Sequence, residues 1–103
     1  MAEIKTMEIN QGVEAFRKTP GAVLYDVRRE EEYATGRIPG SRNIPVQMAA
    51  KMLDEVPDKK TPLFIYCLSG GRSHRAAAFL IRSGYEDVTD LGGINDYKGE
   101  LEV

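Results

Sequence analysis

The run Leu63-Phe64-Ile65-Tyr66 is the feature that most constrains how this chain can fold. Four consecutive apolar or aromatic residues are typical of a strand that is covered on both of its faces. A strand of that kind lies in the middle of a parallel sheet, with helices packed on either side. It leads into a loop with two glycines and then into the clearest helical stretch, residues 73–83, which Gly84 is placed to end. The pattern predicts an α/β fold.

The rest of the chain repeats this alternation of short strands and helices. Further strands are predicted at residues 5–9, 22–25, 43–44 and 88–91, and further helices at residues 11–17, 30–35, 47–53 and in a last short segment after Gly92-Gly93. Within the helix at residues 11–17, the stem of Arg17 is a candidate to face inward beside Val13 and Phe16. Together these elements predict a central, mostly parallel sheet of five strands, flanked by helices on both faces.

Size and composition predict one ordinary globular domain spanning residues 1–103. The chain has 103 residues, of which 42% are hydrophobic and 29% are charged. The net charge of −2 argues against a nucleic-acid partner, because proteins of that class usually carry a strong basic excess.

The same features predict a cytoplasmic protein. One cysteine cannot form an internal disulfide, so the fold does not depend on an oxidising compartment. The first ten residues carry charges and lack the apolar stretch of a signal peptide. The longest apolar run, residues 76–81, is far shorter than the roughly 20 residues of a membrane span. We expect a monomer that is not bound to a membrane.

The only cysteine, Cys67, comes at the C-terminal end of the predicted central strand, which is the edge where open α/β sheets bind ligands. Gly70 and Gly71 can adopt backbone conformations that other residues resist, so the loop can turn successive N–H groups inward around an anion. The start of the next helix adds partial positive charge, and Arg72 adds a full one. Each feature favours a thiolate over a thiol, which makes Cys67 a candidate nucleophile.

Other interpretations of this loop are possible. Cys67 could be a small core residue, because free cysteines are often buried, and the glycine pair could be a plain tight turn. The combination of glycines, arginine and helix start favours the reactive interpretation. A nucleotide-binding P-loop is excluded, because the stretch lacks the Gly-Lys-Ser/Thr ending.

The spacing within the loop distinguishes two kinds of chemistry. Cysteine-dependent phosphatases use Cys-x5-Arg to surround three phosphate oxygens, whereas Cys67 and Arg72 are separated by four residues. A shorter ring of amides should close around something smaller than a phosphoryl group, such as the terminal sulfur of a persulfide. Tyr66, not histidine, precedes the cysteine. Both points favour sulfur transfer, and a phosphatase or arsenate reductase is the less favoured alternative.

Three segments of the chain resemble the rhodanese family, specifically its single-domain members. Residues 25–45, YDVRREEEYATGRIPGSRNIP, resemble the first signature of the family, and residues 66–73, YCLSGGRS, resemble its active-site loop. Residues 84–97, GYEDVTDLGGINDY, resemble its closing segment. Each segment is moderately specific by itself, and the three in this order and spacing are highly specific.

The resemblance implies a thiosulfate sulfurtransferase that carries a persulfide on Cys67. Thiosulfate or another small anionic sulfane donor would load the outer sulfur, and cyanide, a small thiol or an acceptor protein would remove it. No metal or organic cofactor is implied. The alternative is a persulfide carrier or partner-binding module with weak thiosulfate turnover. The residues implied to hold the thiolate and the persulfide through their loop amides are Leu68, Ser69, Gly70, Gly71, Arg72 and Ser73.

The sequence departs from the family pattern in its details. Arg37 stands where the family usually has histidine, Tyr97 stands where tryptophan is common, and the pattern assigns no role to His74. The departure at Arg37 puts the preferred donor in question but leaves the class of chemistry unchanged.

Charged residues elsewhere also bear on the predicted site. Asp26 and Arg28 lie at the end of a buried strand and should reach the same sheet edge as Cys67. We expect them to support the site through a structural ion pair or hydrogen bonds to the backbone, and the alternative is that they position the loop or the substrate. The acidic run at residues 30–32 is expected to be a solvated helix start. Four arginines could form a positive mouth that attracts anions, or could simply be scattered over the surface: Arg37, Arg42, Arg72 and Arg75.

Overall fold

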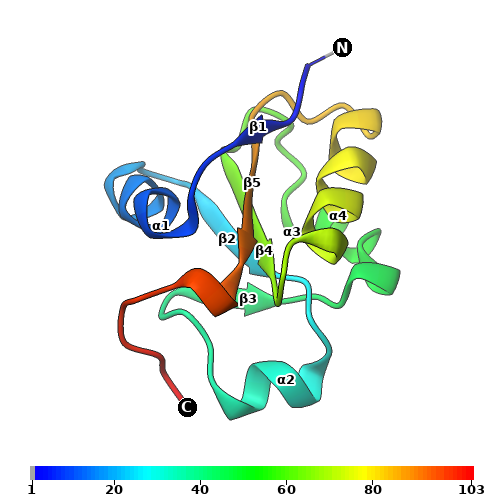
Figure 1. The fold of residues 1–103 in the computed structure, drawn as a ribbon. Coiled ribbons are helices and arrows are strands. Elements are labelled where there is room, and N and C mark those ends of the chain that lie inside the picture. The colour runs from blue at the N-terminus through cyan, green and yellow to red at the C-terminus, as the bar shows by residue number, and fades with distance from the viewer. Residues whose placement is uncertain (1) are drawn as a thin grey trace.

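One parallel sheet organises the computed structural model, which describes residues 2–103 (Figure 1). The strands are β1 (Lys5–Thr6), β2 (Val23–Asp26), β3 (Ser41–Asn43), β4 (Leu63–Cys67) and β5 (Val88–Gly93). Their order across the sheet is β1-β5-β4-β2-β3, and every neighbouring pair runs parallel. The helices are α1 (Ile9–Lys18), α2 (Glu30–Thr35), α3 (Lys51–Glu55) and α4 (Gly71–Arg82), with short 3-10 helices η1 (Val46–Met48) and η2 (Ile94–Asp96).

Strand β4 lies in the middle of the sheet, and all five of its residues are buried. Successive side chains of a strand point to opposite faces, so β4 contributes to two hydrophobic cores. Phe64 and Tyr66 pack in the core under α1, whereas Ile65 and Cys67 pack in the core under α3 and α4. Figure 1 shows α1 on one side of the sheet and α4 on the other. The predicted α/β class, with a five-stranded parallel sheet and helices on both faces, is confirmed.

Several predicted element boundaries are wrong. The first strand ends at Thr6, not at residue 9, because Glu8 caps α1 by accepting from the backbone N–H groups of Asn10 and Gln11 at 3.0 and 3.2 Å. The outer strand β3 covers Ser41–Asn43 and ends one residue before the predicted 43–44 pair does. Arg17, whose stem was a candidate to face inward, is exposed on α1.

The prediction of a single helix at residues 47–53 is also wrong. It divides into η1 and α3, with Ala49 and Ala50 between them. Pro45 fixes where η1 begins, and the first of its 3-10 turns is closed by the Met48 N–H, which donates to the Pro45 carbonyl at 2.8 Å. Within residues 2–103, none of the helices combines the length and apolarity required to cross a bilayer.

Candidate active site at the carboxyl end of β4

The thiol of Cys67 lies where β4 ends, and the residue is only 1% exposed. Cys67 is in register with Gly93 of the neighbouring strand β5. Two backbone N–H groups donate to its Sγ, from Gly70 at 3.0 Å and from Ser73 at 3.3 Å. The sulfur therefore lies inside a short turn of the chain, at the N-terminal end of α4.

The local sequence explains this turn. Gly70 has φ of +115°, a conformation that side chains strongly resist, and it directly precedes the first residue of α4. The first N–H groups of a helix lack partners within the helix and carry partial positive charge. The Ser73 N–H is one of these groups, and it uses the sulfur of Cys67 as its acceptor.

The six loop residues predicted to hold the thiolate differ in whether they contact the Cys67 sulfur. Gly70 and Ser73 supply the N–H groups described above, while Ser69 and Gly71 are exposed. The Leu68 side chain is also exposed, and its carbonyl accepts from the Asn95 N–H at 3.3 Å.

A carboxylate behind the loop fixes Ser73, and sequence reasoning missed it. Asp90 of β5 is 8% exposed and accepts from the Ser73 hydroxyl at 2.7 Å and from the Gly92 N–H at 3.0 Å. His74, whose role the sequence left open, is exposed and has its Nδ1 3.7 Å from Asp90 Oδ2. An acidic residue inside an otherwise buried strand is the signal that could have identified Asp90, because a buried charge requires partners.

The loop also rests directly on the end of β5. A side chain at Gly93 would overlap the carbonyl of Leu68 and the Cα atom of Ser69. Its φ of −115° suits any residue, so the close approach of two backbones is what requires glycine here.

Arg72 does not offer the unpaired charge that the sequence suggested. Its guanidinium donates from Nη1 to Glu32 Oε1 at 2.7 Å and from Nη2 to Glu32 Oε2 at 3.1 Å. Glu32 belongs to α2 and also accepts from the Arg29 N–H at 2.9 Å. The hydrogen bonds from Arg72, followed by that from Arg29, lower the pKa of Glu32 to about 2. The same pairing raises the pKa of Arg72, and the neighbouring Cys67 sulfur contributes further.

The prediction for the acidic run is therefore wrong at one of its three positions. The Glu32 side chain is only 17% exposed, whereas that of Glu31 is 80% exposed. Spacing along the chain could not predict the difference, because Arg72 lies 40 residues further on.

Asp26 and Arg28 form the structural ion pair that the sequence suggested. Both side chains are buried, with Arg28 Nε 3.0 Å from Oδ1 and Nη2 2.7 Å from Oδ2. Arg28 also donates to the Gly36 carbonyl at 2.7 Å, and Asn43 Nδ2 donates to the carbonyls of Asp26 and Arg28. The pair ties the segment that follows β2 to the turn after α2, and Asn43 ties the same segment to the end of β3, at the same sheet edge as Cys67.

The remaining arginines do not gather into a positive mouth. Arg37 pairs with Glu102 at 3.4 Å, with its guanidinium 4.9 Å from the centre of the Tyr33 ring, and Arg42 pairs with Glu55 at 3.5 Å. Arg75 is exposed. Of the two possibilities that the sequence left open, the positive mouth is not supported, because Arg37, Arg42 and Arg72 are each paired with a carboxylate.

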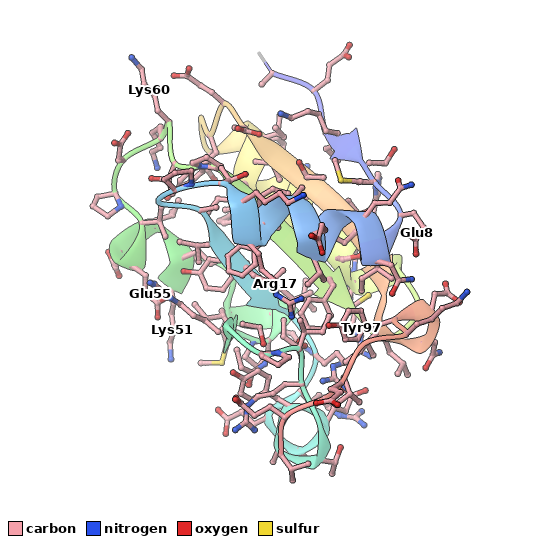
Figure 2. All side chains as sticks on the ribbon, turned by 90° about the vertical axis from the view of Figure 1, so that its left-hand side faces the viewer. Glu8, Arg17, Lys51, Glu55, Lys60 and Tyr97 are labelled. Carbon is pink, nitrogen blue, oxygen red and sulfur yellow. The ribbon has the colours of Figure 1, made fainter. Side chains whose placement is uncertain are left out.

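Tyr97, the second departure from the family pattern, packs at the edge of the core under α1. Its hydroxyl accepts from Arg17 Nη2 at 3.4 Å, and Figure 2 shows the two side chains next to each other. This contact ties the segment after η2 to α1.

Comparisons with known proteins agree with this architecture. The family described as rhodanese-like domain matches residues 10–100. Thiosulfate sulfurtransferase GlpE of Pseudomonas putida is 33% identical over 93 residues, which cover 90% of this chain and 83% of that protein. A sulfurtransferase of Allochromatium vinosum is 37% identical over 75 residues, covering 73% of this chain and 69% of the relative.

Part of a larger protein is also similar. The tRNA uridine(34) hydroxylase of Erwinia tasmaniensis is 35% identical over 104 residues, but the match covers 93% of this chain and only 28% of the hydroxylase. The same domain therefore occurs in proteins whose names describe different reactions.

Solved structures match over most of the chain. A rhodanese from E. coli, determined with anions, has a TM-score of 0.73 and 30% identity, covering 79% of this chain and 96% of that one. A rhodanese-like domain protein from Staphylococcus aureus has a TM-score of 0.83 and 27% identity, covering 97% and 98%. With its parallel sheet, its cysteine at the end of β4 and its match to the family over residues 10–100, the chain belongs to the rhodanese family.

Proposed function

We propose that this protein is a sulfurtransferase that carries a sulfane sulfur atom as a persulfide on Cys67. The observation that carries the proposal is the pair of N–H groups, from Gly70 and Ser73, that donate to Cys67 Sγ. Donors already aimed at an atom stabilise negative charge there without the cost of reorientation. They would stabilise the thiolate before transfer and the persulfide after it.

With thiosulfate as donor, Cys67 Sγ attacks the outer sulfur atom. A new S–S bond forms, the S–S bond of thiosulfate breaks, and sulfite leaves with the electron pair. An acceptor such as cyanide then attacks the outer sulfur of the persulfide and leaves as thiocyanate, which restores the Cys67 thiolate. The cycle needs no oxidant, because both steps move a sulfur atom between nucleophiles.

Steady-state kinetics test this proposal. The wild-type protein should form thiocyanate from thiosulfate and cyanide, and double-reciprocal plots should give the parallel lines of a ping-pong mechanism. Cys67→Ser should form none, although its circular dichroism and urea midpoint stay close to the wild type. Equal rates in the two proteins would contradict a role for Cys67.

A persulfide carrier with weak thiosulfate turnover is the second candidate. It is favoured by the pairing of Arg72 with Glu32, because a guanidinium that already binds a carboxylate is less available to a small dianion. Rapid loading from a persulfide donor combined with slow thiocyanate formation from thiosulfate would distinguish this role from the first.

A further inference from the structure

We propose that Glu32 determines donor specificity: by occupying Arg72, it disfavours dianionic thiosulfate and favours the persulfides of thiols as sulfur donors. This inference rests on the proposed function, because it assigns the class of donor that loads Cys67. Glu32 would act through Arg72 and would not contact the reacting sulfur.

The pair is built as a fixed contact. Both carboxylate oxygens of Glu32 accept from Arg72, at 2.7 and 3.1 Å, in the two-point arrangement that makes arginine–carboxylate pairs strong and directional. The Arg29 N–H holds the same carboxylate from within α2. The side chains are 26% and 17% exposed, so solvent screens the pair less than it screens a surface ion pair.

The surroundings leave little net positive charge for an incoming anion. A Cys67 thiolate, the Arg72 guanidinium and the Glu32 carboxylate together carry one negative charge. Arg28, at the same edge of the sheet, is neutralised by Asp26. The attraction that remains comes from the N–H groups at the start of α4, where a helix presents about half a positive charge. Thiosulfate, with two negative charges, must therefore approach a thiolate and a carboxylate.

In its protonated form, R–S–SH, a hydropersulfide meets less of this repulsion, because its reacting sulfur is uncharged, whereas thiosulfate brings both of its charges on the reacting group. Cys67 Sγ attacks the terminal sulfur, a new S–S bond forms, and the S–S bond of the donor breaks. The thiolate R–S⁻ leaves with the electron pair, and the proton of the terminal sulfur passes to it through solvent. No step requires Arg72 to bind a second anion, so the pair with Glu32 can stay closed.

The test compares two donors, thiosulfate and glutathione persulfide, in three proteins. Glu32→Gln removes the carboxylate from Arg72, and Glu31→Gln is the matched control, since its exposed side chain makes the same change in net charge without touching Arg72. The readout is the ratio of kcat/KM for loading by thiosulfate to kcat/KM for loading by glutathione persulfide. The ratio cancels any effect of the substitution on the reactivity of Cys67 itself.

We expect this ratio to rise on the order of tenfold in Glu32→Gln, and this increase should become smaller at high salt. In Glu31→Gln the ratio should stay within about twofold of the wild type. A Glu32→Gln variant that accelerates both donors equally, or leaves the ratio unchanged, would overturn the assignment. So would wild-type protein that is loaded faster by thiosulfate than by glutathione persulfide, a measurement that does not depend on the variant folding. If neither donor leaves a sulfur on Cys67, the proposed function itself fails.

Discussion

Cys67 combines the burial of a core residue with hydrogen bonds to its sulfur. Its side chain belongs to the core under α4 and is 1% exposed, as expected of a structural cysteine. Its sulfur also accepts from two backbone N–H groups, which a purely apolar packing role would not require. The burial that the sequence left open for Cys67 is observed, and the hydrogen bonds to Sγ distinguish this thiol from an ordinary core cysteine, whereas its reactivity stays a prediction.

Asp90 holds Ser73 in place, and the Ser73 N–H donates to Cys67 Sγ. Asp90→Ala leaves the Gly92 N–H without its acceptor and leaves the Ser73 hydroxyl only backbone carbonyls, the nearer that of Gly70 at 3.0 Å, so the free energy of unfolding should fall by about 1–3 kcal/mol. The rate of persulfide formation should fall as well, since the Ser73 N–H is no longer held toward the sulfur. Urea unfolding and single-turnover loading measure the two effects.

Asp90→Asn is the matched control, because it keeps an oxygen that can accept both hydrogen bonds. It should recover most of the loading rate. If the asparagine variant is as slow as the alanine variant while its stability is intact, the charge of Asp90 matters and its positioning role is wrong.

At the scale of elements, α2 differs from the other α-helices because none of its residues is buried. Polar contacts hold it in place, among them the pair between Glu32 and Arg72 and the hydrogen bond from the Tyr33 hydroxyl to the Ser41 carbonyl at 2.6 Å. Figure 1 shows α2 beyond the edge of the sheet where β4 turns into α4. The stability of α2 should therefore depend on charge and pH more than on apolar burial.

Acid should weaken the docking of α2. The pKa of Glu32 falls from an ordinary 4.5 to about 2 in the folded protein. Its contribution to stability is therefore complete above pH 4.5 and is lost as the pH falls toward 2. We expect Glu32→Gln to be less stable than Glu31→Gln by roughly 1–2 kcal/mol at pH 7, with the gap closing as the pH falls from 4.5 toward 2. Urea unfolding at several pH values measures it, and a gap independent of pH would contradict this account.

The contact between β5 and the loop provides a steric prediction. Gly93→Ala should push the backbone at Leu68 and Ser69 away from β5, because the added methyl group would overlap backbone atoms that cannot rotate aside. We expect loading of Cys67 to slow at least tenfold and the urea midpoint to fall. A variant with normal loading would show that the loop geometry is less critical than the hydrogen bonds to Sγ suggest.

At the scale of the whole molecule, local signals predicted the parts of the site that are contiguous in the chain. The apolar run of β4, the glycines after it and the helix that follows are enough to place Cys67 next to the N-terminus of α4. These signals work because strand burial, positive φ at Gly70 and helix polarity are all set by neighbouring residues.

The parts that the sequence did not predict depend on contacts between distant segments. Glu32 meets Arg72 only because α2 folds back over the loop, and Asp90 reaches Ser73 only because β5 lies beside β4 in the sheet. A run of three glutamates carries no sign of which one faces inward. The sequence left the positive mouth undecided for the same reason, since the carboxylate partners of Arg37, Arg42 and Arg72 come from other parts of the chain.

The account as a whole depends on a sulfur atom being transferred to Cys67. Intact-protein mass spectrometry after incubation with thiosulfate or glutathione persulfide, with and without cyanide, tests this most directly. The account predicts a gain in mass of one sulfur atom that cyanide removes and that Cys67→Ser does not show. Wild-type protein whose mass stays unchanged with both donors, or a gain that persists in Cys67→Ser, would contradict it.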